Sequence, residues 1–376
     1  MRALPFGRIP RVKVSIMNEL TDLISHRFSR AEPRRLVISY MEGLLSSELR
    51  KTAFALASRA REVGPDGMQR LLRTAKWDAD AVRDDLRAYV LRNTRVPAAG
   101  PGDRDRAVLV TAQQTFVKKG RHSAGTAWQY SSEHGRMENC QIGLFLSYVS
   151  EHGTSVLDRE LYLPREWLRD RSRGMSAVLP QRTQYASKAR LNQQMIARVL
   201  DGTPHLPWVS VPERELWDED LRLWLEERGV PYVLKLNHED TAALLPRGMA
   251  DDLLAPPPGG RTAGVNTLPW QTVRLRGPAA GRRAHWLLIH QPTAPSRRPQ
   301  AYLCAGHSTT VTEFIRAVRA QATTQRCLAV LRREVGLDAY QVRTITGWYR
   351  HTTLSLLAHA FRSFSQNRPL REPVPT

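Results

Sequence analysis

The chain has 376 residues, 41% of them hydrophobic, with 56 lysines and arginines against 36 aspartates and glutamates and a formal net charge of +20. This length predicts two or three packed units rather than one small core. No apolar stretch of about 18 residues occurs, the N-terminus has no apolar signal segment, and Cys140, Cys304 and Cys327 have neither zinc nor disulfide spacing. These features exclude a membrane-spanning or disulfide-stabilised secreted protein, so we expect a cytoplasmic, nucleoid-associated one.

The excess of positive charge is carried mainly by arginine. The planar guanidinium group matches the oxygens of a phosphate, so this excess indicates a polyanionic partner. A GC-rich coding sequence would also enrich arginine, but it would not explain the deficit of acidic residues. The composition therefore predicts a nucleic-acid-binding protein.

The N-terminal part predicts a basic lead-in, residues 1–32, that is loosely ordered. Residues 33–95 predict a helical DNA-binding domain, with helices at about 35–45, 47–62 and 66–75 and a fourth that Asp78 caps. Short helices with basic residues on their polar sides are typical of helix-turn-helix DNA readers. A plain helical bundle with a solvated basic face fits this segment equally well.

The rest of the chain alternates strands and helices, which is typical of an α/β fold. A Pro/Gly-rich linker at 96–106 precedes the first part of the core, 107–236, with strands at 107–111, 140–150, 208–211 and 232–236 and helices at 188–200 and 220–228. Residues 237–283 predict an insertion with short strands and a mobile loop around Pro256. The second part of the core, 284–364, has strands at 285–290 and 301–304, a helix at 311–335 that Gly336 ends, and a last helix at 352–364, followed by a tail at 365–376.

Seven sequence islands, in order from about residue 35 to 362, resemble one known family. They lie at 38–45, 71–78, 118–125, 138–143, 158–164 (Asp158-Arg-Glu-Leu-Tyr-Leu-Pro164), 224–230 and 334–351. Together they are similar to the insertion sequence 701 family of DDE transposases. The resemblance implies an RNase H-like mixed sheet flanked by helices, a helical N-terminal domain and a β-rich insertion before the last catalytic helix.

The resemblance also implies two Mg²⁺ ions held by two aspartates and a glutamate beside the scissile phosphate. The matching positions here hold Ala112, Pro212 and Gln325. Alanine has no ligand atom, proline has no side-chain oxygen, and the uncharged glutamine is followed by Arg326. We therefore expect the Mg²⁺ site to be lost, with no metal, no cofactor and no catalytic residues, so that the chain is not an enzyme.

Other readings of the same positions stay open. A relocated active site would have to recruit Asp105, Glu213, Glu313 or Glu334, each several residues or one strand face away from the matched position. Such a site would make the chain an active transposase or nuclease. A decaying transposase relic is the third alternative.

A protein that keeps the body of a transposase without its acids is expected to bind double-stranded DNA, as a site-specific regulator or as the DNA-holding subunit of a larger complex. A homodimer, or a protein or ribonucleoprotein partner, is compatible with this function. The predicted DNA-binding residues are Arg34, Arg35, Arg50, Lys51, Arg73, Lys76, Lys118, Lys119, Arg121, Arg343, Trp348, Tyr349, Arg350 and His351. Packing in the core is an alternative role for Trp348, and a solvated hairpin is an alternative for the residues after 117.

Overall fold

A computed structural model describes residues 11–46, 51–59, 64–94, 107–169, 184–202, 206–245, 249, 270–275, 284–291, 298–306 and 310–365. The predicted linker, the proline-rich loop around Pro256 and the tail beyond residue 365 lie outside these residues. Arg50 and Asp105 lie outside them as well.

The N-terminal part is helical, as predicted. Its helices are α1 (Arg11–Ile24), α2 (Ala31–Leu44), α3 (Ala53–Arg59), α4 (Asp66–Arg73) and α5 (Ala79–Thr94). The predicted apolar faces are buried: α2 buries Leu36, Tyr40 and Leu44, and α5 buries Val82 and Leu86. The Asp78 carboxylate accepts a hydrogen bond from the backbone of Asp80, which supports its predicted role at the start of α5.

The prediction of a loosely ordered lead-in over residues 1–32 is wrong for its second half. Helix α1 occupies Arg11–Ile24, a 3-10 turn covers Ser25–Arg27, and Leu20, Ile24 and Phe28 are fully buried. These three residues are four apart, so they form one narrow apolar stripe on consecutive turns. The stripe is short and follows a basic stretch, which is why it gave no sustained period in the sequence.

A nine-stranded mixed sheet forms the centre of the protein. Its strands are β1 (Val108–Val117), β2 (Ala127–Ser131), β3 (Arg136–Ser150), β4 (Gly153–Tyr162), β5 (Trp208–Val211), β6 (Tyr232–Leu236), β7 (Trp270–Arg274), β8 (His285–His290) and β9 (Gln300–Ala305). The order is β2-β3-β1-β5-β6-β9-β8-β7, and β4 pairs with β3. The run β4-β3-β1-β5-β6 has β1, β5 and β6 parallel and β3 antiparallel. This is the RNase H-like arrangement, so the predicted fold class is confirmed.

Part of the predicted insertion extends this sheet. Strand β7 lies in the insertion and pairs with β8, and β8 pairs with β9, which joins β6. The described part of the insertion also contains helix α10 (His238–Leu244), which Asn237 and Asp240 begin with a capping box. The short strand was expected, whereas the helix was not.

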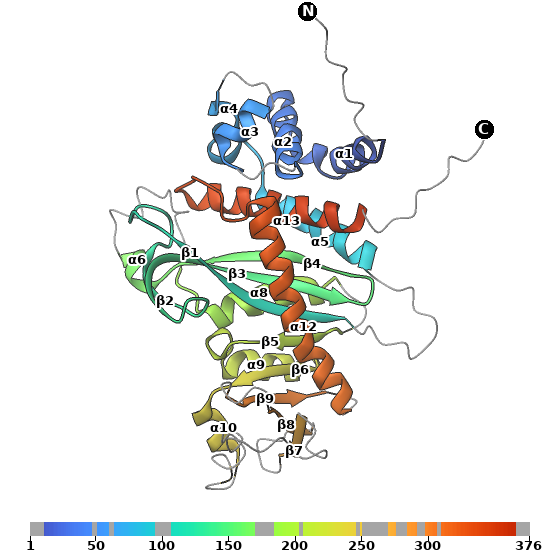
Figure 1. Cartoon of the computed structure of the whole chain (residues 1–376), viewed down its shortest axis with the longest axis vertical. Coiled ribbons are helices and arrows are strands. Elements are labelled where there is room, and N and C mark those ends of the chain that lie inside the picture. The colour runs from blue at the N-terminus through green and yellow to red at the C-terminus, as the bar shows by residue number, and fades with distance from the viewer. Residues whose placement is uncertain are drawn as a thin grey trace, which may run out of the picture.

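Helices cover both faces of the sheet (Figure 1). Helix α12 (Val311–Val330) crosses the front, where Phe314 and Val318 pack against Val108 and Val110 of β1. Helices α8 (Lys188–Leu200) and α9 (Glu219–Glu227) lie on the other face, and the short α6 (Arg165–Arg169) follows β4. Helix α13 (Ile345–Ser365) packs on β4 and α5 and carries α1–α4 above it. No helix in the described ranges is long and apolar enough to span a membrane.

The C-terminal helices differ from their predictions at one boundary. Helix α12 continues as a π-helical turn over Leu331–Val335 and ends at Gly336, whose φ of 79° is left-handed, as the predicted stop requires. Helix α13 begins at Ile345, well before the predicted 352. It buries nearly every side chain from Arg350 to Phe361, polar ones included, so the sequence shows no amphipathic period at its start.

Candidate functional site

The fold brings to one side of the sheet the three positions that match the metal-binding acids of the family, Ala112, Pro212 and Gln325. Parallel pairing joins Val108 to Trp208 and Val110 to Ser210, and this register continued by two residues sets Pro212 beside Ala112. The Gln321 amide of α12 donates a hydrogen bond to Ser210 Oγ at 2.9 Å. Gln325 lies one turn further along α12, so it follows Gln321 on the same helix face.

The side chains at these positions do not fit a two-metal site. Ala112 presents only a buried methyl group, and Pro212 has no donor atom. The oxygens on offer are the Ser210 hydroxyl and the amides of Gln321 and Gln325, all of them uncharged. Two Mg²⁺ ions carry four positive charges, which carboxylates normally offset while supplying hard oxygen ligands.

Beside these positions lies a shallow pocket of about 390 Å³ in which Gln114 and Gln325 share the lining with Arg332, Glu133 and Asp338. Arg332 donates hydrogen bonds to Glu133, to Gln114 Oε1 at 3.4 Å and to Asp338 Oδ2 at 3.3 Å. Both acids of the pocket are therefore paired with one guanidinium group. Sequence reasoning missed Glu133 and Asp338, because only the hairpin of β1 to β3 and the turn after α12 bring them here.

Two of the alternative carboxylates, Glu213 and Glu334, are engaged by other side chains. Glu213 Oε2 accepts a hydrogen bond at 2.6 Å from Gln113, whose side chain lies on the face of β1 opposite to Ala112. Burial raises the pKa of Glu213, and Gln113 is also held by Lys188 at 2.9 Å. Glu334 is paired with Arg333 and Arg362. Neither acid faces the position between Ala112 and Gln325.

The comparison with protein families agrees with this architecture. A family described as DDE superfamily endonuclease matches residues 24–295, which is most of the chain. The chain belongs to this family. The matched segment contains Ala112 and Pro212 and ends before α12, so it does not include Gln325. A search of curated proteins gives no significant match.

Endonucleases of the DDE superfamily act on DNA, and a side chain that contacts DNA must be accessible at the protein surface. Lys51 is 3% exposed, and its ammonium group donates to Gly43 O at 2.9 Å and to Ser46 O at 2.6 Å. A cation at the end of α2 satisfies carbonyls that the helix leaves without partners. The prediction of a DNA contact for Lys51 is wrong for that reason.

Arg350 has the same role at a second helix end. It is 6% exposed, and Nη2 donates to Ala75 O at 2.6 Å and to Trp77 O at 2.8 Å, just after α4. These bonds tie α13 to the N-terminal helices. The predicted DNA contact of Arg350 is therefore also wrong.

His351 and Trp348 belong to the core of this DDE-family chain. His351 accepts a hydrogen bond from Tyr40 at 2.7 Å and donates to Gly336 O at 3.1 Å, and burial lowers its pKa to about 4. Trp348 is 1% exposed and packs against Phe145. The prediction of DNA contacts is wrong for both, and the core alternative for Trp348 is correct.

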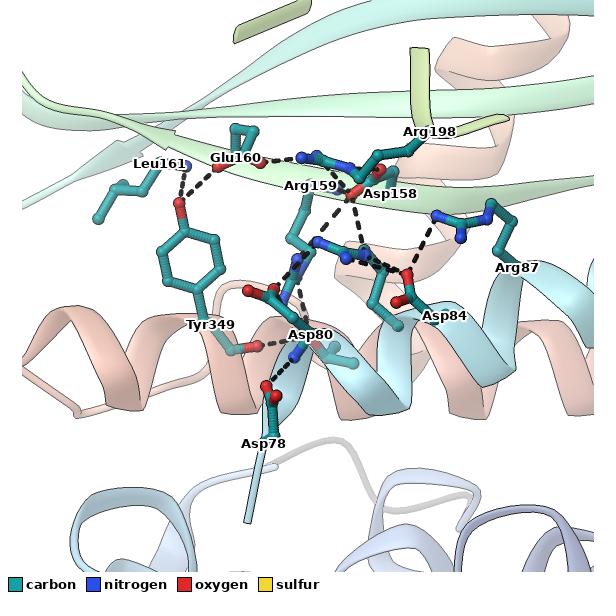
Figure 2. Close-up of polar contacts among 12 residues, drawn as sticks. Asp78, Asp80, Asp84, Arg87, Asp158, Arg159, Glu160, Leu161, Arg198 and Tyr349 are labelled. Carbon is teal, nitrogen blue, oxygen red and sulfur yellow. Dashed lines mark hydrogen bonds and ion pairs between the residues drawn. The ribbon is translucent and has the colours of Figure 1, made fainter. Parts of the chain in front are cut away.

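Tyr349 is held within a polar network between β4 and α13 (Figure 2). Its hydroxyl donates to Glu160 Oε2 at 2.7 Å, and the Arg159 guanidinium group lies 4.7 Å from its ring centroid. Tyr349 is therefore a structural residue, and the DNA contact predicted for it is wrong.

Arg34 is exposed, but its guanidinium group donates to Phe28 O at 2.9 Å and closes the turn between α1 and α2.

Two of the remaining predicted cations, Arg73 and Arg343, line a cleft of about 790 Å³ between α4 and the segment 339–344 that precedes α13. Arg73, His122 and Arg343 line it together with Tyr40 and Tyr340, and its lining in the described chain contains no acidic residue. The other exposed predicted cations are Arg35, Lys76, Lys119 and Arg121. Of the predicted set, the cleft and the neighbouring loop 118–122 therefore bring together Arg73, Lys118, Lys119, Arg121 and Arg343.

Lys118 gives this surface a predicted pH dependence. Its ammonium group lies 3.9 Å from the centroid of the Tyr340 ring, and burial lowers its pKa to about 8, while Asp338 opposes that shift. As pH rises from 7 to 9 the ammonium group loses its proton and with it its positive charge, so we expect the affinity for DNA to fall over this range. Equilibrium binding at fixed salt checks this expectation.

The control for that series is Lys118→Arg, since a guanidinium group stays charged throughout. The arginine variant should show a flat profile between pH 7 and 9. An equally steep fall in both proteins would assign the titration to another group.

Proposed function

We propose that this DDE-family chain is a double-stranded DNA-binding protein that holds DNA without cutting it. Within the superfamily it resembles the insertion sequence 701 transposases. The proposal rests on the side chains where the ends of β1 and β5 meet α12. Ala112 and Pro212 lie at the strand ends and Gln325 lies on the helix, and none of the three has a carboxylate. A site of this composition offers nothing to hold the charge of two metal ions.

Binding is assigned to the cationic cleft. Arg73, Arg343 and His122 come from three separate segments and face one cavity, so a phosphate backbone can be contacted from several sides at once. Phosphate contacts set the register of a protein on the duplex, and base contacts set its sequence preference. The N-terminal helices above α13 supply the base contacts in this proposal, as helix-turn-helix units do.

The residues of the former catalytic face bind and orient DNA rather than transfer protons. Arg332 lies beside the pocket and is held in place by Glu133 and Asp338. The biological role that follows is a factor that marks or silences a site, or a subunit that holds DNA for a partner. Paired sites on one DNA would engage a homodimer.

The proposal is tested by measuring both binding and strand cleavage on one labelled duplex. We expect binding in EDTA to be at least as tight as in Mg²⁺ or Mn²⁺, because no phosphate contact in this proposal runs through a metal and divalent cations compete for the phosphates. We expect the strands to stay intact under all three conditions. Absence of duplex binding in EDTA, with binding restored by the metal, would show that a metal site exists.

A further inference from the structure

The edge strand β2 carries an aromatic surface that the proposed cleft does not use. Trp128 is 66% exposed and Tyr130 is 52% exposed, and they alternate with buried neighbours along β2. Tyr130 pairs with Met137 of β3, which is 47% exposed, and Trp128 pairs with Asn139. Residues directly opposite in an antiparallel pair share a face, so Trp128, Tyr130 and Met137 form one continuous patch.

The opposite face of the same hairpin holds it in place. Gln129 donates to Cys140 O at 2.8 Å, and Ser131 Oγ donates to Thr115 Oγ1 at 3.0 Å. The hairpin is therefore anchored to β1 and β3 without help from the aromatic side. The exposed tryptophan and tyrosine on this rigid strand contribute no free energy of burial to folding. A contiguous apolar patch of this kind indicates a binding surface.

Positive charge borders this patch. The backbone of Lys118 donates to Asn139 O at 2.9 Å, and the Asn139 amide donates to Lys118 O at 2.6 Å and to Gly120 O at 3.1 Å. Asn139 is also the register partner of Trp128, so segment 118–120 and Trp128 lie on the two sides of β3 at the same level. Two strand spacings separate them, about 10 Å.

The aromatic patch and the cationic loop together indicate an unpaired nucleic-acid strand as the ligand. Proteins bind unpaired nucleic-acid strands with exposed aromatic rings beside a cationic loop, since bases stack on the rings and the cations contact the phosphates. A paired duplex hides its base faces and has no use for the rings. Lys119 and Arg121 are both exposed in the bordering loop, whose neighbour His122 lines the cleft, so the two surfaces are continuous.

We propose that Trp128 and Tyr130 stack the bases of an unpaired DNA strand that continues from a duplex held in the cleft, with Lys119 contacting its phosphates. This inference rests on the proposed function and adds a second class of ligand, single-stranded DNA at the end of a duplex. The patch lies at the sheet edge formed by β2, on the same face of the sheet that α12 covers at β1.

The test compares a blunt duplex with the same duplex carrying a short single-stranded thymine extension on one strand. We expect the extension to raise the affinity of the unchanged protein at least tenfold, the usual size of one base stacked on an aromatic ring. The double variant Trp128→Ala/Tyr130→Ala should lose most of this gain, because it keeps only the phosphate contact to the extension. Trp128→Phe should restore part of the gain.

The matched control is Leu223→Ala, which removes an apolar side chain that is 44% exposed on α9. It should leave both affinities unchanged. If the extension adds nothing, or if the double variant keeps the whole gain, the stacking proposal fails while the duplex-binding function stands. If the unchanged protein binds neither DNA, the proposed function fails and the stacking proposal fails with it.

A protein partner is a separate outcome. Light scattering on the unchanged protein and on the double variant measures whether copies of the chain associate through this patch. A dimer that the double variant converts to a monomer, with no change in the gain from the extension, would overturn the stacking proposal and make the patch an interface between copies.

Discussion

Replacing Arg73, Arg121 and Arg343 together by alanine is expected to lower the affinity for double-stranded DNA about 100-fold at physiological salt. Two of these side chains line the cleft, and Arg121 lies in the adjoining loop. None of the three forms an ion pair with a described residue. Each charge is therefore available to a phosphate, and each contact is worth about 1 kcal/mol.

The same variant should also change the salt dependence. Every neutralised phosphate releases counterions, so the slope of log affinity against log salt should become shallower by about 3. Equilibrium binding over a salt series measures both quantities on one duplex. The slope separates a lost phosphate contact from a change in folding, which would leave the remaining active protein with its original slope.

A charge-matched control removes three exposed arginines from other elements. Arg228 follows α9, Arg274 ends β7 and Arg319 lies in the first half of α12. Their triple alanine variant has the same net charge as the cleft variant. If it weakens binding as much as the cleft variant does, net charge alone drives binding and the cleft is not the binding site.

Replacing Asp158 by alanine is expected to destabilise the protein by about 3–5 kcal/mol. Asp158 is fully buried in β4, and Arg198 of α8 donates to it at 2.8 and 3.2 Å (Figure 2). Arg83 of α5 and the buried Arg159 lie 3.9 Å from the same carboxylate. Loss of one acid leaves a group of buried guanidinium charges without its central partner.

The consequence of that loss reaches beyond β4. Arg159 also pairs with Asp80 at 2.8 Å and donates to Thr353 Oγ1 of α13 at 2.9 Å. The network thus joins the N-terminal helix α5 to the sheet and to α13, the helix that carries the N-terminal domain (Figure 2). The denaturation midpoint in urea reports the destabilisation.

Asp84→Ala is the control for Asp158→Ala. Asp84 pairs with Arg83 and Arg87 at the edge of the same network, but its side chain is 44% exposed. Its loss should cost no more than about 1 kcal/mol, because water screens an exposed pair. Equal destabilisation by the two variants would contradict the assignment of Asp158 as the buried centre.

The sequence predicted most of the helices and strands because their apolar patterns are local. The N-terminal helices α2–α5, strands β5 and β6 and the stop at Gly336 follow from spacing and from capping residues. Strand β1 was predicted to end at Thr111, before the polar residues Gln113 and Gln114. It continues to Val117 because long-range pairing with β3 buries those residues, which no local pattern reveals.

The site was harder to predict than the fold. Ala112 and Pro212 come side by side because β1 and β5 pair in parallel register, and both strands have a local apolar pattern. Lys51 and Arg350 were misassigned, since a basic residue that binds carbonyls at a helix end has the same sequence signature as one that binds phosphate. Trp128 and Tyr130 were missed because their exposure depends on β2 being an edge strand.

The most direct test of the account is a nicking assay on a bound, end-labelled duplex in Mn²⁺, which supports metal-dependent strand cleavage widely. We expect a protein–DNA complex of reduced gel mobility in which both strands remain intact after prolonged incubation. Strand breaks that require the metal and disappear in Glu213→Gln or Glu334→Gln would contradict it, because they would show that a carboxylate outside the matched positions has restored the active site. Breaks that persist in each of the four variants Asp105→Asn, Glu213→Gln, Glu313→Gln and Glu334→Gln would belong to a contaminating nuclease.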